Sequence, residues 1–314
     1  MNPNGLAFPE VIDSSMIAAA RSCHQKVYLE FFEHWKSQDP SVHLHAGRSY
    51  ADGLEAGRRA FYEQGKSAPD AVAIGITECL KAYGNFQCPE DSAKSASRTA
   101  GAVEYHFDRY PLGDDRSIPI LLPNGKRAIE FNGVEPIDIS HPVTGQPLLY
   151  SWRMDMACTR DGMNMGHDDK TTVQLGASWP KQWDLRSQFT AYCWGAAKAG
   201  IPLRGFIIRG VSILKTKYDT LEAITYRQQW QIDQWYAQLL RDVRRLIAAW
   251  QEGYFDWNLD HACTEYGGCP FKQVCLSPSP ETLLPQLYQR RRWDPVLRTE
   301  TVLVTDEELT ANEQ

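Results

Sequence analysis

The sequence predicts an α/β fold, because segments with helical spacing of apolar residues stand before and after a segment with strand patterns. Apolar residues recur at helical spacing from Ser14 to about Trp35 and again from Tyr50 to about Tyr83, so we expect the first third of the chain to be mostly helical. Between about Gly101 and Thr172 the spacing changes to that of strands and hairpin arms, which predicts the sheet.

Strands and hairpin arms in this middle region are expected at Ile118–Leu122, Ala128–Phe131 and Leu148–Met156, with an Asn124-Gly125 turn between the first two. Helical spacing returns over Trp183–Ala199 and ends at the glycine and proline that follow. Two further strands are predicted at Gly205–Leu214 and Ala223–Tyr226. A long amphipathic helix follows, with a nearly complete apolar stripe from Ile232 to Trp250.

The composition is that of an ordinary globular chain, with 43% hydrophobic and 23% charged residues, which excludes wholesale disorder and collagen-like or coiled-coil architectures. No apolar run is long enough to span a bilayer, so we expect no membrane partner. The first residues carry Glu10 and Asp13 but no basic residue before Arg21, unlike a secretory signal or a mitochondrial presequence. We therefore expect a cytoplasmic protein.

The formal net charge of −6 does not indicate a polyanion partner, so any nucleic-acid surface must be a local groove of Lys and Arg. The sequence contains no Gly-x4-Gly-Lys-Ser/Thr and no Gly-x-Gly-x2-Gly motif. An ATP-driven motor and a Rossmann enzyme therefore lack their signatures here.

Two aspartates and one lysine in the strand-rich region suggest a metal site. Asp155 lies near the end of one predicted strand, and Asp168-x-Lys170 follows on the next, where alternation points residues 168 and 170 to the same face. Asp155 and Asp168 could share a hard divalent cation with the carbonyl of Asp169, leaving other positions to water and a phosphate oxygen. Lys170 could orient the attacking water and neutralise charge on the phosphate. The alternative is a pair of solvated strand ends with a routine salt bridge.

Several other side chains could complete such a site. Gln188 and Tyr192 lie one turn apart on the following helix and could hold Lys170 or a nucleotide, although Tyr192 also falls on the apolar stripe. His45 could be a further metal ligand, with a helix cap or a surface position as the alternative. Glu104 could approach from a neighbouring strand, with a structural salt bridge as the alternative.

Four cysteines form a second candidate metal site. Cys263, Cys269 and Cys275 are spaced by six, and Cys23 is the candidate for a fourth ligand, because Cys158 and Cys193 sit inside apolar patterns typical of buried cysteine. Four thiolates suit either a 4Fe-4S cluster or tetrahedral zinc. The sequence has no Cys-x2-Cys knuckle, so we favour the iron-sulfur cluster over structural Zn²⁺, with unligated structural cysteines as a third possibility. Joining residues 23 and 263 would close a very long loop.

Taken in order, the motifs resemble the RecB-like branch of the PD-(D/E)XK nuclease superfamily, especially iron-sulfur members related to the AddB nuclease domain, CRISPR-adaptation exonucleases and phage-encoded RecB-like proteins. The resemblance covers roughly residues 14 to 276. It rests on Cys23, His45, Asp155, Asp168-x-Lys170, Gln188-x3-Tyr192 and the last three cysteines. It implies a restriction-endonuclease-like core with a central mixed sheet flanked by helices, hydrolysis of phosphodiesters with Mg²⁺ or Mn²⁺, and a cluster that ties the ends of the chain together.

The resulting expectation divides the chain into four consecutive segments: a helical N-terminal region (1–100), the nuclease core (101–250), a cluster-binding segment (251–280) and a tail (281–314). We expect the acidic end of the tail, from about Thr299, to be mobile.

The predicted function is a metal-dependent DNA nuclease, expected to be an exonuclease, acting in DNA recombination, repair or replication in a bacterial cell or a phage-infected host. Its predicted partners are single-stranded DNA or duplex ends and, because no motor motif is present, a helicase or recombination protein. Trp152, Trp179 and Trp183 could stack bases, and Arg290-Arg291-Arg292 could contact phosphates, with core packing and a solvated run as the alternatives. The rival function is a non-catalytic nucleic-acid-binding or scaffold protein that keeps the fold and its cluster.

Overall fold

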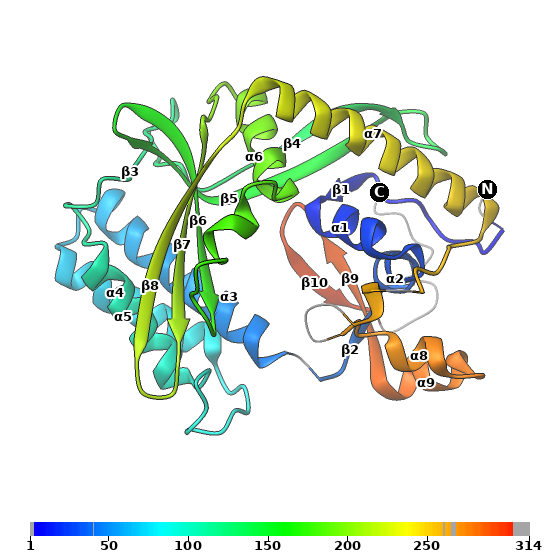
Figure 1. The fold of residues 1–314 in the computed structure, drawn as a ribbon, viewed down its shortest axis with the longest axis horizontal. Coiled ribbons are helices and arrows are strands. Elements are labelled where there is room, and N and C mark those ends of the chain that lie inside the picture. Colours follow the sequence, from blue (N-terminus) through cyan, green and yellow to red (C-terminus); the bar gives the residue numbers. More distant parts are fainter. Residues whose placement is uncertain (1–2, 40, 260, 265–267, 304–314) are drawn as a thin grey trace. The chain divides into compact units, whose positions relative to one another are not determined.

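The structure is a computed structural model that describes residues 3–39, 41–259, 261–264 and 268–303 (Figure 1). The chain packs into two compact units. Unit 1 comprises Met1–Asp39, Val134–Trp152 and Asp233–Gln314, and unit 2 comprises Pro40–Gly133 and Arg153–Ile232. The four segments expected from the sequence follow the order of the chain, whereas each unit is assembled from separated stretches.

Unit 2 is built on a mixed sheet. Its strands are β3 (Ile118–Pro119), the last part of β5 (Pro147–Arg160), β6 (Met163–Thr172), β7 (Gly205–Ile213) and β8 (Tyr218–Tyr226). β6 and β7 are parallel, whereas β3 and β6 run antiparallel to β5 and β8 runs antiparallel to β7. β4 (Ile129–Ser140) also pairs with β5.

Helices cover both faces of this sheet. The helices of unit 2 are α3 (Val42–Tyr62), α4 (Ala68–Tyr83), α5 (Ala96–Arg109), the 3-10 turn η2 (Pro180–Trp183) and α6 (Ser187–Lys198). Val211 and Ile213 of β7 pack among α3, α4 and α5, whereas Phe206, on the other face of β7, stacks on Phe189 of α6 with ring centroids 4.7 Å apart. The prediction of a central mixed sheet flanked by helices is therefore confirmed.

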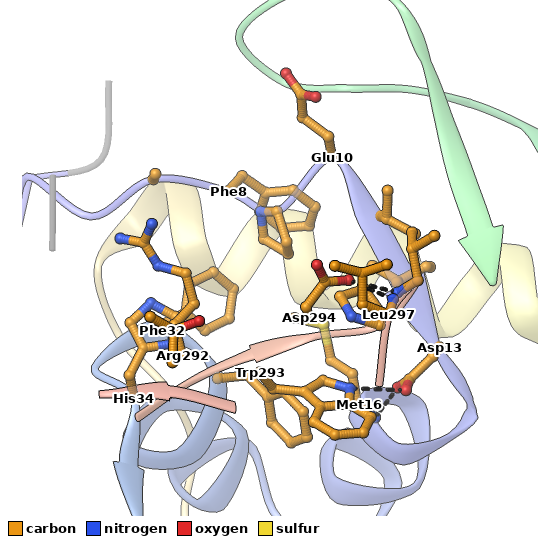
Figure 2. Close-up of a pocket in the computed structure, with 18 residues that line it drawn as sticks. Phe8, Glu10, Asp13, Met16, Phe32, His34, Arg292, Trp293, Asp294 and Leu297 are labelled. Atoms are coloured by element: carbon orange, nitrogen blue, oxygen red, sulfur yellow. Dashed lines mark hydrogen bonds between the residues drawn. The ribbon is translucent and has the colours of Figure 1, made fainter. Parts of the chain in front are cut away.

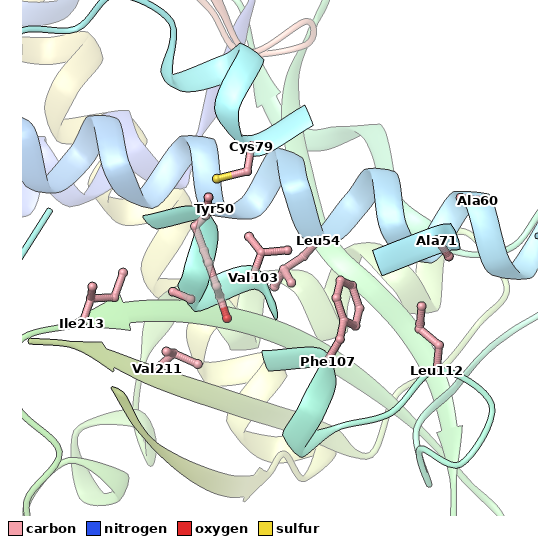
Figure 3. Packing of buried hydrophobic residues seen from close by; sticks show 12 residues of the cluster. Tyr50, Leu54, Ala60, Ala71, Cys79, Val103, Phe107, Leu112, Val211 and Ile213 are labelled. Atoms are coloured by element: carbon pink, nitrogen blue, oxygen red, sulfur yellow. The ribbon is translucent and has the colours of Figure 1, made fainter. Parts of the chain in front are cut away.

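The core between α3, α4, α5 and β7 is shown in Figure 3. Tyr50 and Leu54 of α3 meet Val103 and Phe107 of α5, and Val211 closes the cluster from the sheet. Each of these side chains is at most 5% exposed, so this apolar layer supplies much of the burial that stabilises unit 2.

The close approach of α3 and α4 depends on glycine. A Cβ at Gly53 would lie 2.8 Å from the carbonyl oxygen of Gly75, and a Cβ at Gly75 would lie 2.7 Å from that of Gly53. Any side chain at either position would push the two helices apart, because carbon and oxygen atoms cannot approach so closely without a shift of the backbone.

One predicted element is wrong. The segment Val103–Phe107, which we expected to be a strand, lies inside α5, and Glu104 is exposed on that helix. Ser95 begins the helix by accepting a hydrogen bond from the main-chain N–H of Arg98 at 3.4 Å. The buried positions of α5 recur at helical spacing, so tertiary packing decides its conformation over the strand preference of Val, Tyr and Phe.

Unit 1 contains the N-terminal strand and most of the remaining helices. β1 (Val11–Asp13) pairs in parallel with the first part of β5, where Val11 lies opposite Leu149. Asp13 caps the next helix, because its Oδ1 accepts hydrogen bonds from the main-chain N–H groups of Ser15 and Met16 at 2.9 Å. The helical elements are α1 (Ser14–Ser22), α2 (His24–Val27), the π-helical turn η1 (Tyr28–Phe32), the 3-10 turn η3 (His261–Cys263), α8 (Lys272–Leu276) and α9 (Pro280–Leu287).

The long amphipathic helix is present as α7 (Gln229–Glu252), which begins in unit 2 and lies mostly in unit 1. Leu239, Val243 and Leu246 are fully buried on its apolar stripe. No helix of the described residues is long and apolar enough to cross a membrane.

A three-stranded antiparallel sheet corrects the expectation of a C-terminal tail. β9 (Tyr288–Asp294) lies between β2 (Trp35–Ser37) and β10 (Thr299–Val302). Arg291, which we considered for phosphate contact, pairs with Glu300 at 3.7 Å, and the guanidinium of Arg290 lies over the ring of Trp35. Main-chain pairing therefore fixes the residues after Thr299 up to residue 302, while the rest of the predicted tail, residues 304–314, lies outside the described residues.

Candidate active site

β5 and β6 bring the predicted carboxylates together in unit 2. Their antiparallel register pairs Met156 with His167, which places Asp155 beside Asp168. The Oδ2 atom of Asp155 also accepts a hydrogen bond of 2.7 Å from the main-chain N–H of Asp169. Asp168 is almost completely buried, so its carboxylate faces the interior of a site and is not a solvated strand end.

Lys170 shares the face of β6 with Asp168, as the alternation along a strand predicts. Its Nζ lies 2.5 Å from Oδ2 of Asp168, and 34% of the Lys170 side chain is exposed. Burial opposes the charge on Lys170, but the carboxylates of Asp168 and Asp155 outweigh it and raise the pKa of the ammonium group. Lys170 is therefore protonated at neutral pH, and its side chain reaches solvent.

Burial disfavours the ionised forms of both aspartates. Burial, followed by the nearby carboxylates of Asp168 and Glu130, raises the pKa of Asp155 well above its usual range. Burial also raises the pKa of Asp168, although Lys170 opposes the shift. Two neighbouring carboxyl groups in an environment of low dielectric constant resist ionisation unless a cation binds between them. The donor set of two carboxylates is what a divalent cation with oxygen ligands requires.

α6 presents the predicted glutamine and tyrosine to the lysine. Gln188 Nε2 donates a hydrogen bond of 2.7 Å to the hydroxyl of Tyr192. Tyr192 is 2% exposed, and its ring lies 5.7 Å from that of Phe206 between centroids. In its ionised form Tyr192 contributes to the raised pKa of Lys170, after the larger effects of Asp168 and Asp155, so its hydroxyl lies near the ammonium group. The pair therefore stands beside the lysine, and Tyr192 belongs to the core at the same time.

The opposite face of β6 holds a buried polar group that the sequence analysis missed. The carboxylate of Asp169 pairs with Arg58 Nη1 of α3 at 2.7 Å and lies 3.5 Å from His167 Nδ1 and 3.8 Å from His106 Nε2. The hydroxyl of Tyr50 lies 2.8 Å from Nδ1 of His106. Burial lowers the pKa of His106 to about 3. Burial opposes the charge of Asp169 too, but Arg58 and the histidines outweigh it and hold its pKa well below the usual range.

A signal for this group is present in the sequence. Arg58 follows Tyr50 and Leu54 at intervals of four on the buried stripe of α3, where a charged residue requires a buried partner. Glu130 was also missed. It has a positive φ of 51°, its Oε2 lies 3.1 Å from Arg153 Nε, and its charge acts on Asp155. Backbone strain of this kind in a residue other than glycine often marks a functional position.

The remaining predicted residues have other contacts. His45 Nε2 lies 2.9 Å from the carbonyl oxygen of Tyr83, and its ring stacks on Phe86 with centroids 4.1 Å apart. Among the described residues, His45 forms no hydrogen bond or ion pair with the carboxylates, and its role as a ligand stays a prediction. The tryptophans considered for base stacking are buried, which agrees with the core alternative: Trp152, Trp179 and Trp183.

The four predicted cysteines lie together in unit 1. Burial, then the thiols of Cys269, Cys23 and Cys263, raises the pKa of Cys275 to about 11. The main-chain N–H of Cys269 donates to the carbonyl oxygen of Cys263 at 3.2 Å. Asn258 connects Cys23 and Cys263, because its main-chain N–H donates to Cys23 Sγ at 3.4 Å and its carbonyl accepts from Cys263 Sγ at 3.7 Å.

Two of the cavities lined by described residues lie in unit 1. One of about 460 Å³ is lined by Cys263 and Cys269, so open space adjoins two of the thiols. The other, of about 340 Å³, is lined by Phe8, Asp13 and Trp293 among others (Figure 2). It contains none of the predicted catalytic or metal-binding residues, although Arg292, considered for phosphate contact, lines it. Among the described residues, no three His, Cys, Asp or Glu side chains are arranged closely enough around one point to hold a single metal ion as they stand.

No protein-family model matches the sequence, and no curated protein is similar to it at a significant level. The structure is similar to the crystal structure of a protein named "Putative exonuclease" from Eubacterium rectale, with a TM-score of 0.48 and 13% sequence identity over 86% of this chain and 93% of that chain. It is also similar to that of SSO0001, with a TM-score of 0.29 and 14% identity over 63% of this chain and 74% of that chain. At these TM-scores the two similarities assign neither a fold nor an activity to this chain.

Proposed function

We propose that this protein is a metal-dependent DNA nuclease with a PD-(D/E)XK active site. The observation that carries the proposal is the meeting of Asp155, Asp168 and Lys170 on one face of adjacent strands. Two carboxylates with raised pKa values and a charged lysine suit the binding of a divalent cation next to a phosphodiester.

The metal would be Mg²⁺ or Mn²⁺, held by Asp155 and Asp168, with the main-chain carbonyl of Asp169 and His45 as further predicted ligands. Mg²⁺ usually takes few protein ligands and keeps several waters, so a site with two carboxylates does not need a closed set of protein ligands. When bound, the ion supplies a Lewis acid and makes water a better nucleophile near neutral pH.

The residues of the chain have separate roles in this proposal. Lys170 brings a positive charge to the phosphate oxygens and stabilises the negative charge that grows on them. Tyr192 and Gln188 position the lysine in this proposal, since the tyrosine hydroxyl lies near Lys170 and accepts a hydrogen bond from Gln188. The packing of Tyr192 on Phe206 limits the movement of that hydroxyl. Positioning of this kind lowers the entropic part of the barrier.

The cysteines support a second metal site in unit 1, and we propose that Cys23, Cys263, Cys269 and Cys275 hold a 4Fe-4S cluster. The interactions among the four thiols support a shared ligand set. Four thiolates suit either an iron-sulfur cluster or tetrahedral zinc. The sequence has no Cys-x2-Cys knuckle typical of zinc sites, so the cluster is the proposal and structural Zn²⁺ the alternative.

DNA is the proposed substrate, and attack from an end is the proposed mode, in recombination, repair or replication. Anaerobically purified protein would be incubated with labelled linear and closed circular DNA, single-stranded and duplex, in Mg²⁺, Mn²⁺ or EDTA. We expect cleavage of linear DNA that requires the metal and is lost in Asp168→Ala. Lys215→Ala is the control, because that lysine forms an exposed ion pair with Asp91. A wild-type protein that binds DNA but cuts nothing in either metal would favour the non-catalytic function.

A further inference from the structure

The middle residue of the Asp168-Asp169-Lys170 motif touches both faces of the sheet. Its main-chain N–H donates a hydrogen bond of 2.7 Å to Oδ2 of Asp155, on the side of the proposed metal site. Its side chain points to the other face, because alternation along β6 places it with His167. A contact that restricts the side chain of Asp169 therefore also restricts its main-chain N–H group, which is hydrogen-bonded to the Asp155 carboxylate.

Arg58 makes such a contact with the side chain of Asp169. Its Nη1 lies 2.7 Å from Asp169 Oδ2, and the two side chains are 5% and 1% exposed. Arg58 is itself held, because its Nη2 lies 3.3 Å from Nε2 of His106, whose Nδ1 lies 2.8 Å from the hydroxyl of Tyr50. A buried pair with so many contacts has little freedom to move, since a charge that left its partner would remain desolvated and uncompensated.

We infer that Arg58 and Asp169 form a positioning pair, which orients the carboxylate of Asp155 for metal binding through the main-chain N–H of Asp169. Neither side chain touches the proposed metal or substrate. The inference rests on the proposed function, because it assigns these residues to the same site. It explains why an ion pair is buried directly behind the carboxylates, where an apolar pair would fill the space without the cost of desolvating two charges.

Unit 2 offers a matched control for a purely structural role. Arg209 forms a second buried ion pair on the same side of the sheet, with Asp115 at 2.5 Å and Glu222 at 3.0 Å. Among the described residues, Asp115 forms no hydrogen bond with Asp155 or its strand, and its main-chain neighbours are in the segment before β3. Loss of the Asp115 charge weakens an ion pair on this side of the sheet, where Glu222 still contacts Arg209, without releasing the N–H group of Asp169.

The experiment measures binding of Mn²⁺ alone, without DNA, from the electron paramagnetic resonance signal of free Mn²⁺. Wild type, Asp169→Asn, Arg58→Met and Asp115→Asn are compared well below their unfolding temperatures, with Asp168→Ala as the variant that lacks a proposed ligand. We expect Asp169→Asn and Arg58→Met to weaken Mn²⁺ binding at least tenfold. Asp115→Asn should remain within twofold of wild type although it also lowers the melting temperature.

The outcomes separate the two proposals. If wild type binds Mn²⁺ no better than Asp168→Ala, the proposed metal site fails and the positioning role fails with it. A second outcome is that wild type binds Mn²⁺ and Asp168→Ala does not, so the metal site stands. If Asp169→Asn then binds Mn²⁺ as tightly as wild type or as Asp115→Asn, only the positioning role is overturned. Arg58→Lys replaces Arg58→Met if the latter does not fold, and should weaken binding less because it keeps the charge but not the planar guanidinium.

Discussion

Lys170 and Asp168 occupy the same face of β6, with Nζ of the lysine 2.5 Å from Oδ2 of the aspartate. The ammonium group thus holds the place beside Asp168 that a divalent cation would compete for. Lys170 has two opposing effects in this arrangement: it neutralises the carboxylate before the metal binds, and it offers a positive charge to phosphate afterwards.

These two effects predict that Lys170→Met separates cleavage from metal binding. Cleavage should fall by about 100-fold or more, because a charge that stabilises the transition state is removed. Mn²⁺ should bind at least as tightly as in wild type, because the competing cation next to Asp168 is gone. Single-turnover cleavage and Mn²⁺ titration measure the two quantities. A parallel loss of both, as expected for Asp168→Asn, would contradict the assigned role of the lysine.

Metal binding should release protons and should strengthen as pH rises. The pKa values of Asp155 and Asp168 are raised in the folded protein, so part of each carboxyl population is protonated at a pH where a free carboxyl is ionised. Only the ionised forms bind a cation, and affinity therefore falls as pH falls through the raised pKa values. Calorimetry in two buffers of different ionisation enthalpy counts the protons released. Zero release at pH 5 to 6 would show that neither carboxyl titrates in that range.

Tyr192→Phe should slow cleavage and leave the fold intact. The variant keeps the ring contacts with Phe189 and Phe206 but removes the hydroxyl that accepts from Gln188 and acts on Lys170. A loss of roughly tenfold in the single-turnover rate corresponds to about 1.4 kcal/mol of transition-state stabilisation. The control is Gln182→Ala, which removes another amide of unit 2, one that donates to the carbonyl of Trp179. Equal rates in Tyr192→Phe and wild type would leave Tyr192 as a core residue only.

Acid should begin to destabilise the fold at a pH above the range in which ordinary carboxylates titrate. Burial lowers the pKa of His106 to about 3 and that of His34 to about 4, and it lowers that of His167 well below its usual value. The unfolded chain protonates these histidines near pH 6.5, so stability present above that pH is lost as pH falls toward 4, by up to about 1.4 kcal/mol per pH unit for each group.

Denaturant unfolding at pH 7.5, 6.5 and 5.5 measures this slope. His106→Asn should reduce it, because one proton fewer is taken up on unfolding, whereas His43→Gln, at an exposed position, should not change it. Identical slopes in His106→Asn and wild type would mean that His106 does not contribute to the loss of stability.

Local patterns predicted the parts of the site that depend on one strand or one helix. The alternation along β6 predicted that Asp168 and Lys170 share a face, and the helical period predicted that Gln188 and Tyr192 lie together. The sheet and α7 were also predictable, because their periods are long and regular. The strand assigned to Val103–Phe107 was wrong because a five-residue segment with β-branched and aromatic side chains at alternate positions, Val103, Tyr105 and Phe107, suits either conformation.

The buried group around Asp169 could not be predicted in detail for a different reason. Arg58 and Asp169 lie on α3 and β6, far apart in sequence, and only the packing of that helix on the sheet shows that they are partners. The pattern of α3 marks Arg58 as a charged residue on a buried stripe but does not identify its partner. The same holds for Glu130, whose positive φ has no local signature such as glycine.

The cysteine site predicts a loss of both metal and stability in Cys23→Ser. Wild type purified without oxygen should contain about four irons per chain, or about one zinc if the alternative holds. The variant should lose that metal, because Cys23 is the proposed ligand from the N-terminal helices and the other three proposed ligands are Cys263, Cys269 and Cys275. Releasing a crosslink over so long a loop costs on the order of 5 kcal/mol in a chain-entropy picture, or about 10 °C or more in melting temperature.

Cys88→Ser is the matched control for that experiment, because Cys88 is also partly exposed but belongs to unit 2 and is not one of the four proposed ligands. It should keep the full metal content and the melting temperature of wild type. Metal analysis together with thermal unfolding, before and after treatment with a chelator, decides the matter. Chelation should lower the melting temperature of wild type and of Cys88→Ser to that of Cys23→Ser. If wild type carries neither iron nor zinc, or if Cys23→Ser retains the metal, the four cysteines are structural thiols.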